Sequence, residues 1–147
     1  MNEAKLKEKQ KFFLEGYKLG SIFVTYGMSL AYNDNNEAVW TLPFNPGLTN
    51  GISIHGGAIA TLIDSAGWFT AAQYYDAWLT TVEISTRFLD SEKSDDLVAT
   101  GHVVKIGQRI ATIDMTIKAK TTEKLVATGS GTYIVTNTPV PVLSDAP

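Results

Sequence analysis

Two adjacent glycines, Gly56 and Gly57, follow His55 and precede a long apolar run. If this run is a helix, its first backbone N–H groups have no carbonyl partner within the helix, and the helix dipole adds partial positive charge there. Glycine lacks the Cβ atom that keeps a ligand at a distance, so a carbonyl oxygen that gains negative charge under attack can approach these amides closely. The alternative is that the glycines only permit a tight junction between loop and helix.

Asp64 is the one ionisable side chain, tyrosines aside, between Gly57 and Asp76, and it lies amid Leu62, Ile63, Ala66 and Trp68. Burial of a carboxylate without a partner is costly, so this group must be functional, paired or protonated. Desolvation would raise its pKa and make it a stronger base or a more reactive nucleophile. The alternative is an aspartate that hydrogen-bonds a neighbouring chain or caps a loop.

The spacing of these two features predicts a site shared between two chains. Seven residues of helix place Gly57 and Asp64 on a similar face but about 10 Å apart along the axis. One reacting carbonyl cannot touch both. If a symmetric dimer lays two such helices antiparallel, Gly57 of one chain faces Asp64 of the other across one cleft, which gives two shared sites per dimer.

The segment that must carry these residues runs from His55 to Tyr75, and apolar residues cover nearly all of its faces. A helix of this kind has to be surrounded by other structure. We therefore expect a central buried helix.

Four long segments rich in β-forming residues follow this helix, joined by turns short enough for consecutive antiparallel hairpins. The third alternates along its length, with Ala111, Ile113 and Met115 on one face and polar residues on the other. That pattern predicts one buried and one solvated face. The four segments are Asp76–Asp90, Ser94–Ile106, Arg109–Lys120 and Lys124–Thr136.

The part of the chain before the buried helix predicts three smaller elements. Asn2–Leu19 is charged and favours an amphipathic helix that ends near Gly20 and packs on an edge or at a mouth. Ile22–Tyr32 and Glu37–Phe44 predict a hairpin whose turn is the asparagine-rich stretch at 33–36. Asn45–Ser53 carries prolines and glycines and predicts a loop.

The order of these elements predicts an α+β fold in which one curved antiparallel sheet of about six strands wraps around the buried helix, with a short helix at the N-terminus. We expect a single domain over residues 1–138 and a flexible tail over residues 139–147, where Pro139, Pro141 and Pro147 lie. An uncovered sheet face or edge strand would be covered by a second copy, so at least a dimer is expected.

The composition excludes several classes of function. The net charge of -3 provides no positive field for duplex nucleic acid, and no apolar run reaches the roughly 18 residues of a membrane span. There is no cysteine and only two histidines, His55 and His102, which argues against thiol nucleophiles and metal sites. We expect a cytoplasmic protein without cofactor or metal, whose chemistry comes from carboxylates, hydroxyls and backbone.

The run His55-Gly56-Gly57, with Asp64 nine positions after the histidine, an Asn/Gly loop before it and the strand Thr80–Phe88 after it, resembles the hotdog-fold acyl-CoA thioesterases of the phenylacetate-degradation (PaaI-like) type. The resemblance extends over roughly residues 22–135. It implies hydrolysis of a thioester between coenzyme A and an acyl group by a homodimer, or by a tetramer of two such dimers.

Carried onto this chain, the resemblance implies that Gly57 is the oxyanion donor and that Asp64 is the general base or nucleophile, contributed by the partner subunit. His55 would orient the loop and help to hold the thioester. The family's asparagine falls at Thr49, so Asn50, one place later, is assigned to substrate binding, with Asn45 as a possible substitute. Thr81 would position the water, and Gly56, Thr80 and Ser65 are assigned to substrate binding.

Other residues admit two interpretations. Three cations, Arg87, Lys105 and Arg109, either contact coenzyme A phosphates or are solvated strand charges. His102 is better explained by a structural role. A group of aromatic residues either lines an acyl or aryl pocket or belongs to the core. These are Trp68, Phe69, Tyr74, Tyr75 and Trp78.

Two other functions compete with the thioesterase. A hotdog-fold hydratase or dehydratase would need a histidine and a carboxylate placed for proton transfer at carbon, which the Gly-Gly pair and single distal Asp64 fit less well. A non-catalytic acyl-CoA-binding module would show the same cavity without turnover. A DNA-reading regulator is disfavoured, because the 20 residues before Ser21 are too short for an added helix-turn-helix.

Overall fold

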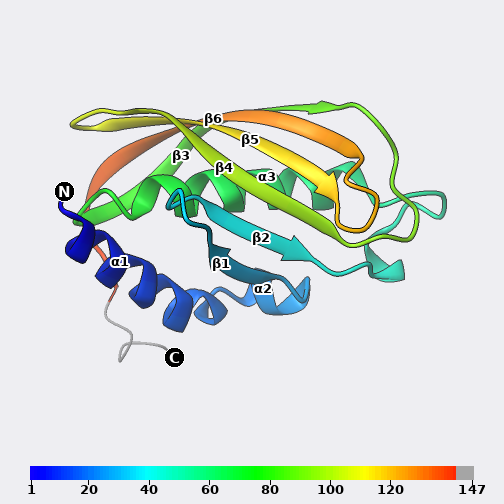
Figure 1. The fold of residues 1–147 in the computed structure, drawn as a ribbon, viewed down its shortest axis with the longest axis horizontal. Helices are drawn as coiled ribbons and strands as arrows, with labels where there is room; N and C mark the ends of the chain where they lie inside the picture. Colours follow the sequence, from blue (N-terminus) through cyan, green and yellow to red (C-terminus); the bar gives the residue numbers. More distant parts are fainter. Residues whose placement is uncertain (142–147) are drawn as a thin grey trace.

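The computed structural model of the chain describes residues 1–141 (Figure 1). Three helical segments come first, followed by two short strands, a single turn of 3-10 helix, one long helix and four long strands. In chain order they are α1 (Glu3–Gly16), η1 (Tyr17–Leu19), α2 (Ser21–Thr25), β1 (Ser29–Tyr32), β2 (Ala38–Leu42), η2 (Pro46–Leu48), α3 (Gly56–Ala72), β3 (Ala77–Phe88), β4 (Leu97–Ile106), β5 (Ile110–Ala119) and β6 (Leu125–Pro139).

All six strands form one antiparallel sheet in the order β1-β2-β4-β5-β6-β3, and the sheet curves around α3 (Figure 1). In β5 the alternation predicted from the sequence is observed, because Ala111, Ile113 and Met115 are buried while Asp114 and Lys118 are exposed. The predicted α+β arrangement of a curved sheet around one buried helix is therefore confirmed.

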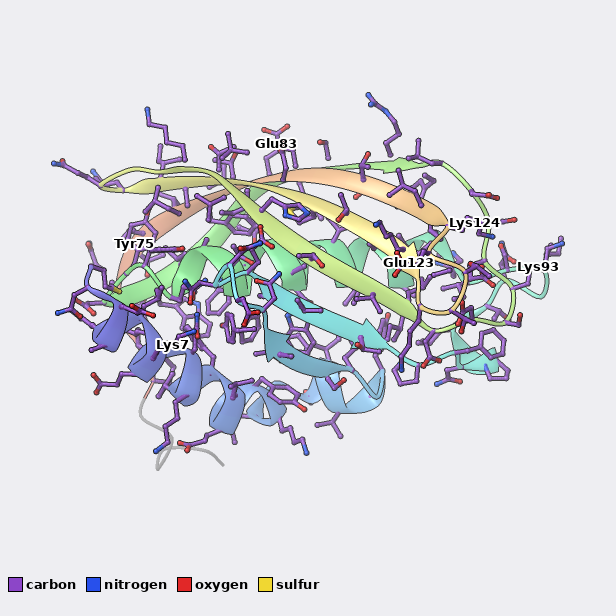
Figure 2. The ribbon with its side chains drawn as sticks, in the orientation of Figure 1. Lys7, Tyr75, Glu83, Lys93, Glu123 and Lys124 are labelled. Atoms are coloured by element: carbon purple, nitrogen blue, oxygen red, sulfur yellow. The ribbon has the colours of Figure 1, made fainter. Side chains whose placement is uncertain are left out.

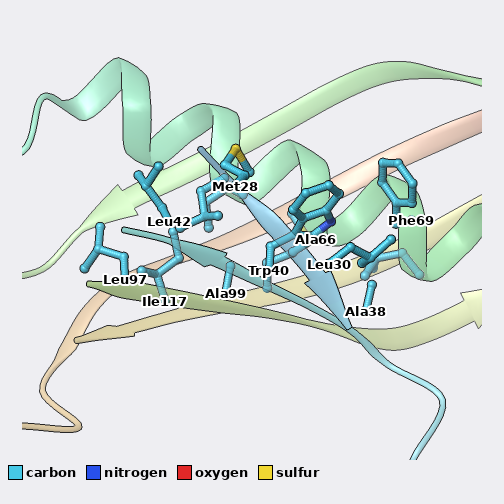
Figure 3. Close-up of a cluster of buried hydrophobic side chains, with 14 of the residues drawn as sticks. Met28, Leu30, Ala38, Trp40, Leu42, Ala66, Phe69, Leu97, Ala99 and Ile117 are labelled. Carbon is cyan, nitrogen blue, oxygen red and sulfur yellow. The ribbon is translucent and has the colours of Figure 1, made fainter. Parts of the chain in front are cut away.

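Helix α3 begins after His55, whose side chain caps it, and it is buried along most of its length. Its apolar residues pack against the inner faces of the strands, and Trp40 of β2, fully buried, meets Phe69 of α3 edge-on (Figure 3). Trp40 also stacks on Phe23. Burial of several aromatic rings together supplies much of the hydrophobic stabilisation. The core thus lies between α3, the sheet and the N-terminal helices.

Helix α1 is fixed to the C-terminal end of α3 by polar contacts. The Gln10 Nε2 group donates to Gln73 Oε1 at 2.8 Å, and both side chains are buried. At the surface, Lys5 and Lys9 pair with Asp76 at 2.6 and 3.0 Å. These contacts hold the second half of α1, with η1 and α2, over the middle of α3.

The prediction of a strand from Ile22 is wrong, because Ser21–Thr25 forms α2 and β1 begins only at Ser29. The β-branched residues of this stretch favour a strand, but Phe23 packs into the aromatic core and Gly27, with φ +67°, reverses the chain after it. Helix α1 ends at Gly16, three residues before the predicted end, and a turn of 3-10 helix completes the segment.

Strand β6 extends to Pro139, one residue into the predicted tail, and residues 142–147 of that tail lie outside the described residues. Within residues 1–141 no helix is long and apolar enough to cross a membrane. The same range contains no group of three or more side chains arranged to hold a metal ion.

Candidate active site

The side chain of Asp64 lies half-buried on α3 and accepts a hydrogen bond from the Thr81 hydroxyl of β3 at 2.9 Å. Desolvation raises the pKa of Asp64, and the bond from Thr81 opposes this by favouring the charged form. The pairing register of β3 with β6 shifts between Thr81 and Glu83, where Val82 is the additional residue of a β-bulge. The structure therefore brings together the predicted acid and the predicted hydroxyl within one chain.

A cavity of about 420 Å³ opens beside Asp64. Its only charged lining side chain among the described residues is Asp64, and Thr61 and Ser65 are its neighbours on the same stretch of α3. The rest of the lining is apolar and largely aromatic. It includes Phe12, Phe13, Tyr17, Phe23, Trp68, Phe69 and Trp78.

The roof of this cavity comes from α1, η1 and α2, which sequence reasoning did not assign to the site. The prediction placed α1 at an edge or a mouth, without a role for its side chains. The signal in the sequence is the aromatic content of the segment, where Phe12, Phe13, Tyr17 and Phe23 occur within a dozen residues. Aromatic side chains on a short, charged helix indicate a partner surface that needs apolar cover.

At the beginning of α3, the His55 Nδ1 atom accepts a hydrogen bond from the Gly57 N–H at 2.9 Å. His55 is thus the N-cap of the helix, and its own N–H donates to Leu48 O at 2.8 Å. The amide assigned as the oxyanion donor is occupied by the imidazole in this structure. An imidazole that moves aside exposes that N–H at the positive end of the helix dipole.

A second cavity, of about 360 Å³, lies beside the helix N-terminus and is lined by Asn50, Gly56, Ile59 and Phe88, among others. Asp64 lines only the first cavity, and Gly56 lines only the second. In one chain, then, the acid and the helix N-terminus face different cavities. This separation agrees with the 10 Å spacing argued from the sequence.

The two asparagines proposed for the loop have different positions. Asn50 lines the second cavity, and its side-chain oxygen accepts from the N–H groups of Ile52 and Ser53, both at 3.0 Å. Asn45 caps η2 by accepting from Gly47 N–H at 2.8 Å. Of the two, only Asn50 lies at the α3 N-terminus.

Two residues assigned to substrate binding, Ser65 and Thr80, differ in their position relative to the first cavity. Ser65 lines the first cavity, and its hydroxyl donates to Thr61 O at 2.7 Å. Thr80 is exposed and lies on the opposite face of β3 from Thr81, because neighbouring strand residues alternate. The structure does not bring Thr80 to Asp64 within this chain.

The three cations proposed to contact coenzyme A phosphates are exposed, and within one chain they do not all lie together. Arg87 precedes Phe88 near the second cavity, whereas Lys105 and Arg109 flank the β4–β5 turn. That turn lies at the other end of α3, where Tyr75 donates to Gly107 O at 2.8 Å. Among the aromatic residues, Trp68, Phe69 and Trp78 line the first cavity, while Tyr74 and Tyr75 do not.

His102 lies on the outer face of the sheet, because the preceding residue, Gly101, faces α3. Its Nδ1 atom is 2.8 Å from Glu37 Oε1, and its Nε2 atom is 3.1 Å from Thr116 Oγ1. These contacts join β4 and β5 to the start of β2 and place His102 away from Asp64.

Glu92 supports the loop before His55, a role that sequence reasoning missed. Its buried carboxylate accepts from three successive backbone N–H groups, those of residues 93–95, and pairs with Lys124 at 3.0 Å. These bonds, that of Ser94 first, lower its pKa to about 2. The Glu92 carbonyl in turn accepts from Ile54 N–H at 2.8 Å.

A sequence profile of the thioesterase superfamily matches residues 53–126, which is half of the chain and includes the His55 cap, α3 and Thr81. The chain belongs to the thioesterase superfamily. Curated protein sequences, in contrast, give no significant match.

Several solved structures share the fold of this chain at low sequence identity. The Escherichia coli PaaI protein of the phenylacetic acid degradation operon superimposes with a TM-score of 0.82 at 21% identity, over 94% of this chain and 98% of that protein. A Streptococcus mutans protein solved with acetyl-CoA gives 0.68 at 23% identity, over 77% and 91%. A thioesterase family protein from Silicibacter pomeroyi gives 0.77 at 21%, over 88% and 96%. These similarities establish the hotdog-like fold.

Proposed function

We propose that this thioesterase superfamily member hydrolyses acyl-CoA thioesters. The observation that carries the proposal is Asp64, a half-buried carboxylate that bonds Thr81 at the wall of an apolar cavity. Burial raises its pKa and leaves it a stronger base or nucleophile than an exposed aspartate. The acyl group would enter the aromatic cavity, and the thioester carbonyl would lie beside the acid.

The complete site is proposed to form between two chains. Strand β3 is a sheet edge of 12 residues, and apolar side chains at or after its end are exposed, with Phe88 at 54% and Leu89 at 48%. A long edge strand of this kind is a template for pairing with another chain. Antiparallel pairing of β3 with the β3 of a second copy would lay the two α3 helices side by side, with Gly57 of one facing Asp64 of the other.

In this arrangement, the Asp64 carboxylate either takes a proton from a water that attacks the thioester carbon or attacks that carbon itself. The oxygen that becomes negative is stabilised by the Gly57 N–H of the other chain. Because His55 occupies this N–H in the free protein, the imidazole would have to turn away as the thioester enters. On the first route the coenzyme A thiolate leaves and takes the proton that Asp64 accepted from the water. On the second route the thiolate leaves and is protonated by water, and a further water then hydrolyses the mixed anhydride to release the acid and restore the Asp64 carboxylate.

The cavity favours small or medium apolar acyl groups, aryl groups included. Its polar lining side chains, Thr61, Asp64 and Ser65, are all on α3, while aromatic side chains cover the remainder. The hydroxyls of Thr61 and Ser65 already bond helix carbonyls. A charged distal group on the acyl chain would therefore lose its hydration without gaining a partner.

A second candidate is a non-catalytic acyl-CoA-binding module, and the occupied Gly57 N–H is the observation that favours it. The proposal is tested by the release of free thiol from a panel of acyl-CoAs, comparing the wild type with D64A. We expect release by the wild type and its loss in the variant. Binding without release would establish the binder, and full activity in D64A would refute the role of Asp64.

A further inference from the structure

The hydroxyl of Tyr133 is buried without a hydrogen-bond partner. Tyr133 lies on β6, is fully buried, and its hydroxyl is one of two such unpartnered side-chain groups within residues 1–141. The other, the Trp40 indole N–H, lies among the core rings of Tyr17, Phe23 and Phe69. A buried hydroxyl without a partner destabilises the folded protein, and a phenylalanine at this position would avoid that cost.

The chain also keeps space for this hydroxyl. A Cβ atom at Gly67 on α3 or at Gly131 on β6 would overlap the Tyr133 hydroxyl. Two glycines, one on a helix and one on a strand, thus border a group that makes no bond in the free protein. Glycine within a helix carries its own cost relative to alanine.

The hydroxyl lies on the side of α3 and of the sheet that carries the acid and its partner. Gly67 follows Asp64 by three residues, so both are on one face of α3. Tyr133 is the direct cross-strand partner of Thr81, so the two side chains project from the same face of the sheet. Thr81 donates to Asp64. The negative charge of Asp64 and burial both raise the pKa of Tyr133, so the phenol stays protonated and able to donate.

The chemistry of Thr81 explains why a second donor is needed. A threonine hydroxyl has one proton, and in the free protein Asp64 accepts it. If Thr81 turns this proton toward the attacking water, Asp64 loses its donor. We propose that Tyr133 is a positioning residue whose hydroxyl donates to Asp64 when the Thr81 proton turns to the water. The catalytic part of this inference rests on the proposed function.

Other titratable groups near the acid do not compete for this role. Glu83, the next charged residue of β3 after Thr81, points away from α3 (Figure 2). Tyr17 faces Asp64 only across the cavity, from its roof. In the described part of α3 no other side chain is charged.

The test measures the pKa of Asp64 by carboxyl NMR titration in the wild type, Y133F, T81V and the double variant. With Thr81 present, Y133F should change this pKa little. In the T81V background, Tyr133 becomes the donor, so adding Y133F should raise the pKa of Asp64 by about half to one pH unit. An unchanged pKa in that background would overturn the inference.

Kinetics give the second readout. Y133F should lower kcat by about threefold to tenfold, the effect of one hydrogen bond, with KM unchanged and an unfolding midpoint equal to or above that of the wild type. A purely structural hydroxyl would instead lower the midpoint and leave kcat unchanged, which would overturn the inference. Y75F is the matched control, because it removes a hydroxyl bonded to Gly107 O and should not alter the pKa of Asp64.

The two proposals fail in different ways. A wild type that releases no thiol refutes the thioesterase, while the NMR titration still reports on the Tyr133–Asp64 pair. A normal thioesterase whose double variant titrates like T81V refutes only the role of Tyr133.

Discussion

Asp64 is half-buried and accepts one hydrogen bond, from Thr81. Burial and this hydrogen bond shift its pKa in opposite directions. Desolvation raises its pKa, and the Thr81 hydroxyl partly offsets the increase. A carboxyl group whose pKa is higher in the folded state than in the unfolded state is harder to ionise after folding. The free energy of unfolding therefore decreases as pH rises from the unfolded-state pKa to the folded-state pKa. Above the folded pKa this cost is fully present, so the charged form of Asp64 is the form that weakens the fold.

Replacement of Asp64 by asparagine therefore has opposite consequences for activity and for stability. We expect D64N to lose at least about 100-fold in kcat, the lower range for removal of a general base. Its unfolding midpoint at pH 7 should equal or exceed that of the wild type, because the amide carries no desolvated charge. Thiol release and thermal unfolding followed by circular dichroism measure the two. A D64N protein that unfolds well below the wild type would show that Asp64 is structural.

At the scale of elements, the N-terminal segments α1, η1 and α2 form the roof of the cavity beside Asp64. The sequence predicts α3 and the four long strands well, because their apolar patterns extend over ten or more residues. The predicted hairpin between the first two of these strands is wrong, because β3 pairs with β6 and β4 pairs with β2. The sequence fails at Ser21–Thr25, where β-branched residues favour a strand and the tertiary contact of Phe23 selects a helix. The cavity could not be predicted, since it depends on how α1 docks on α3, where Phe13 meets Trp68 and Phe69 edge-on.

Shortening of the roof should weaken substrate binding more than chemistry. In the double variant F12A/Y17A, the cavity loses two aromatic walls but keeps Asp64 and Thr81. We expect KM for an aryl- or medium-chain acyl-CoA to rise about tenfold, while KM for acetyl-CoA changes less, because burial of a larger acyl group depends on this area. The matched control is L14A, whose side chain is exposed on α1 and does not line the cavity. An equal change for both substrates would contradict the assignment of the roof.

The loop that carries His55 depends on the Glu92 carboxylate. In the folded protein its pKa is about 2, below the ordinary value of 4.5, so its contribution to stability is present at neutral pH and is lost as pH falls from 4.5 toward 2. We expect E92Q to lower the free energy of unfolding at pH 7 by about 1–3 kcal/mol. The difference between E92Q and the wild type should shrink as pH falls through that window. Chemical denaturation at pH 7 and pH 3 measures it, and a constant difference would refute the charge effect.

At the scale of the whole molecule, the separation of Asp64 and the α3 N-terminus into two cavities is the feature that calls for a second copy. The sequence predicts this separation through helix geometry alone, since seven residues cannot place both groups at one carbonyl. The sequence does not reveal that the His55 side chain accepts a hydrogen bond from the Gly57 N–H, because this bond depends on the orientation of the imidazole. Nor does it reveal Tyr133, whose relation to Asp64 arises from the β3–β6 register.

Mixed oligomers test the shared site. G57V and D64N should each be inactive alone. Randomly reassociated mixtures should recover about a quarter of wild-type activity, because half of the dimers are mixed and each mixed dimer contains one intact site. Co-refolding followed by a thiol assay provides the measurement, and the oligomeric state is checked by light scattering. Absence of any recovery in demonstrably mixed dimers would contradict sharing.

The order of strands in the sheet also affects how the chain is made. Strand β3 directly follows α3, yet its only neighbour in the described sheet is β6, the last strand to be synthesised. In a nascent chain that has emerged only as far as Lys124, one flank of the apolar helix α3 is uncovered and Thr81 lies on the unpaired strand β3. Pairing between strands this far apart in the sequence is slow, and apolar surface that is prone to aggregation stays exposed until the strands have paired. Thr81 thus reaches its place beside Asp64 only after β6 has been synthesised, and until then the flank of α3 that β6 and β3 cover stays exposed to aggregation.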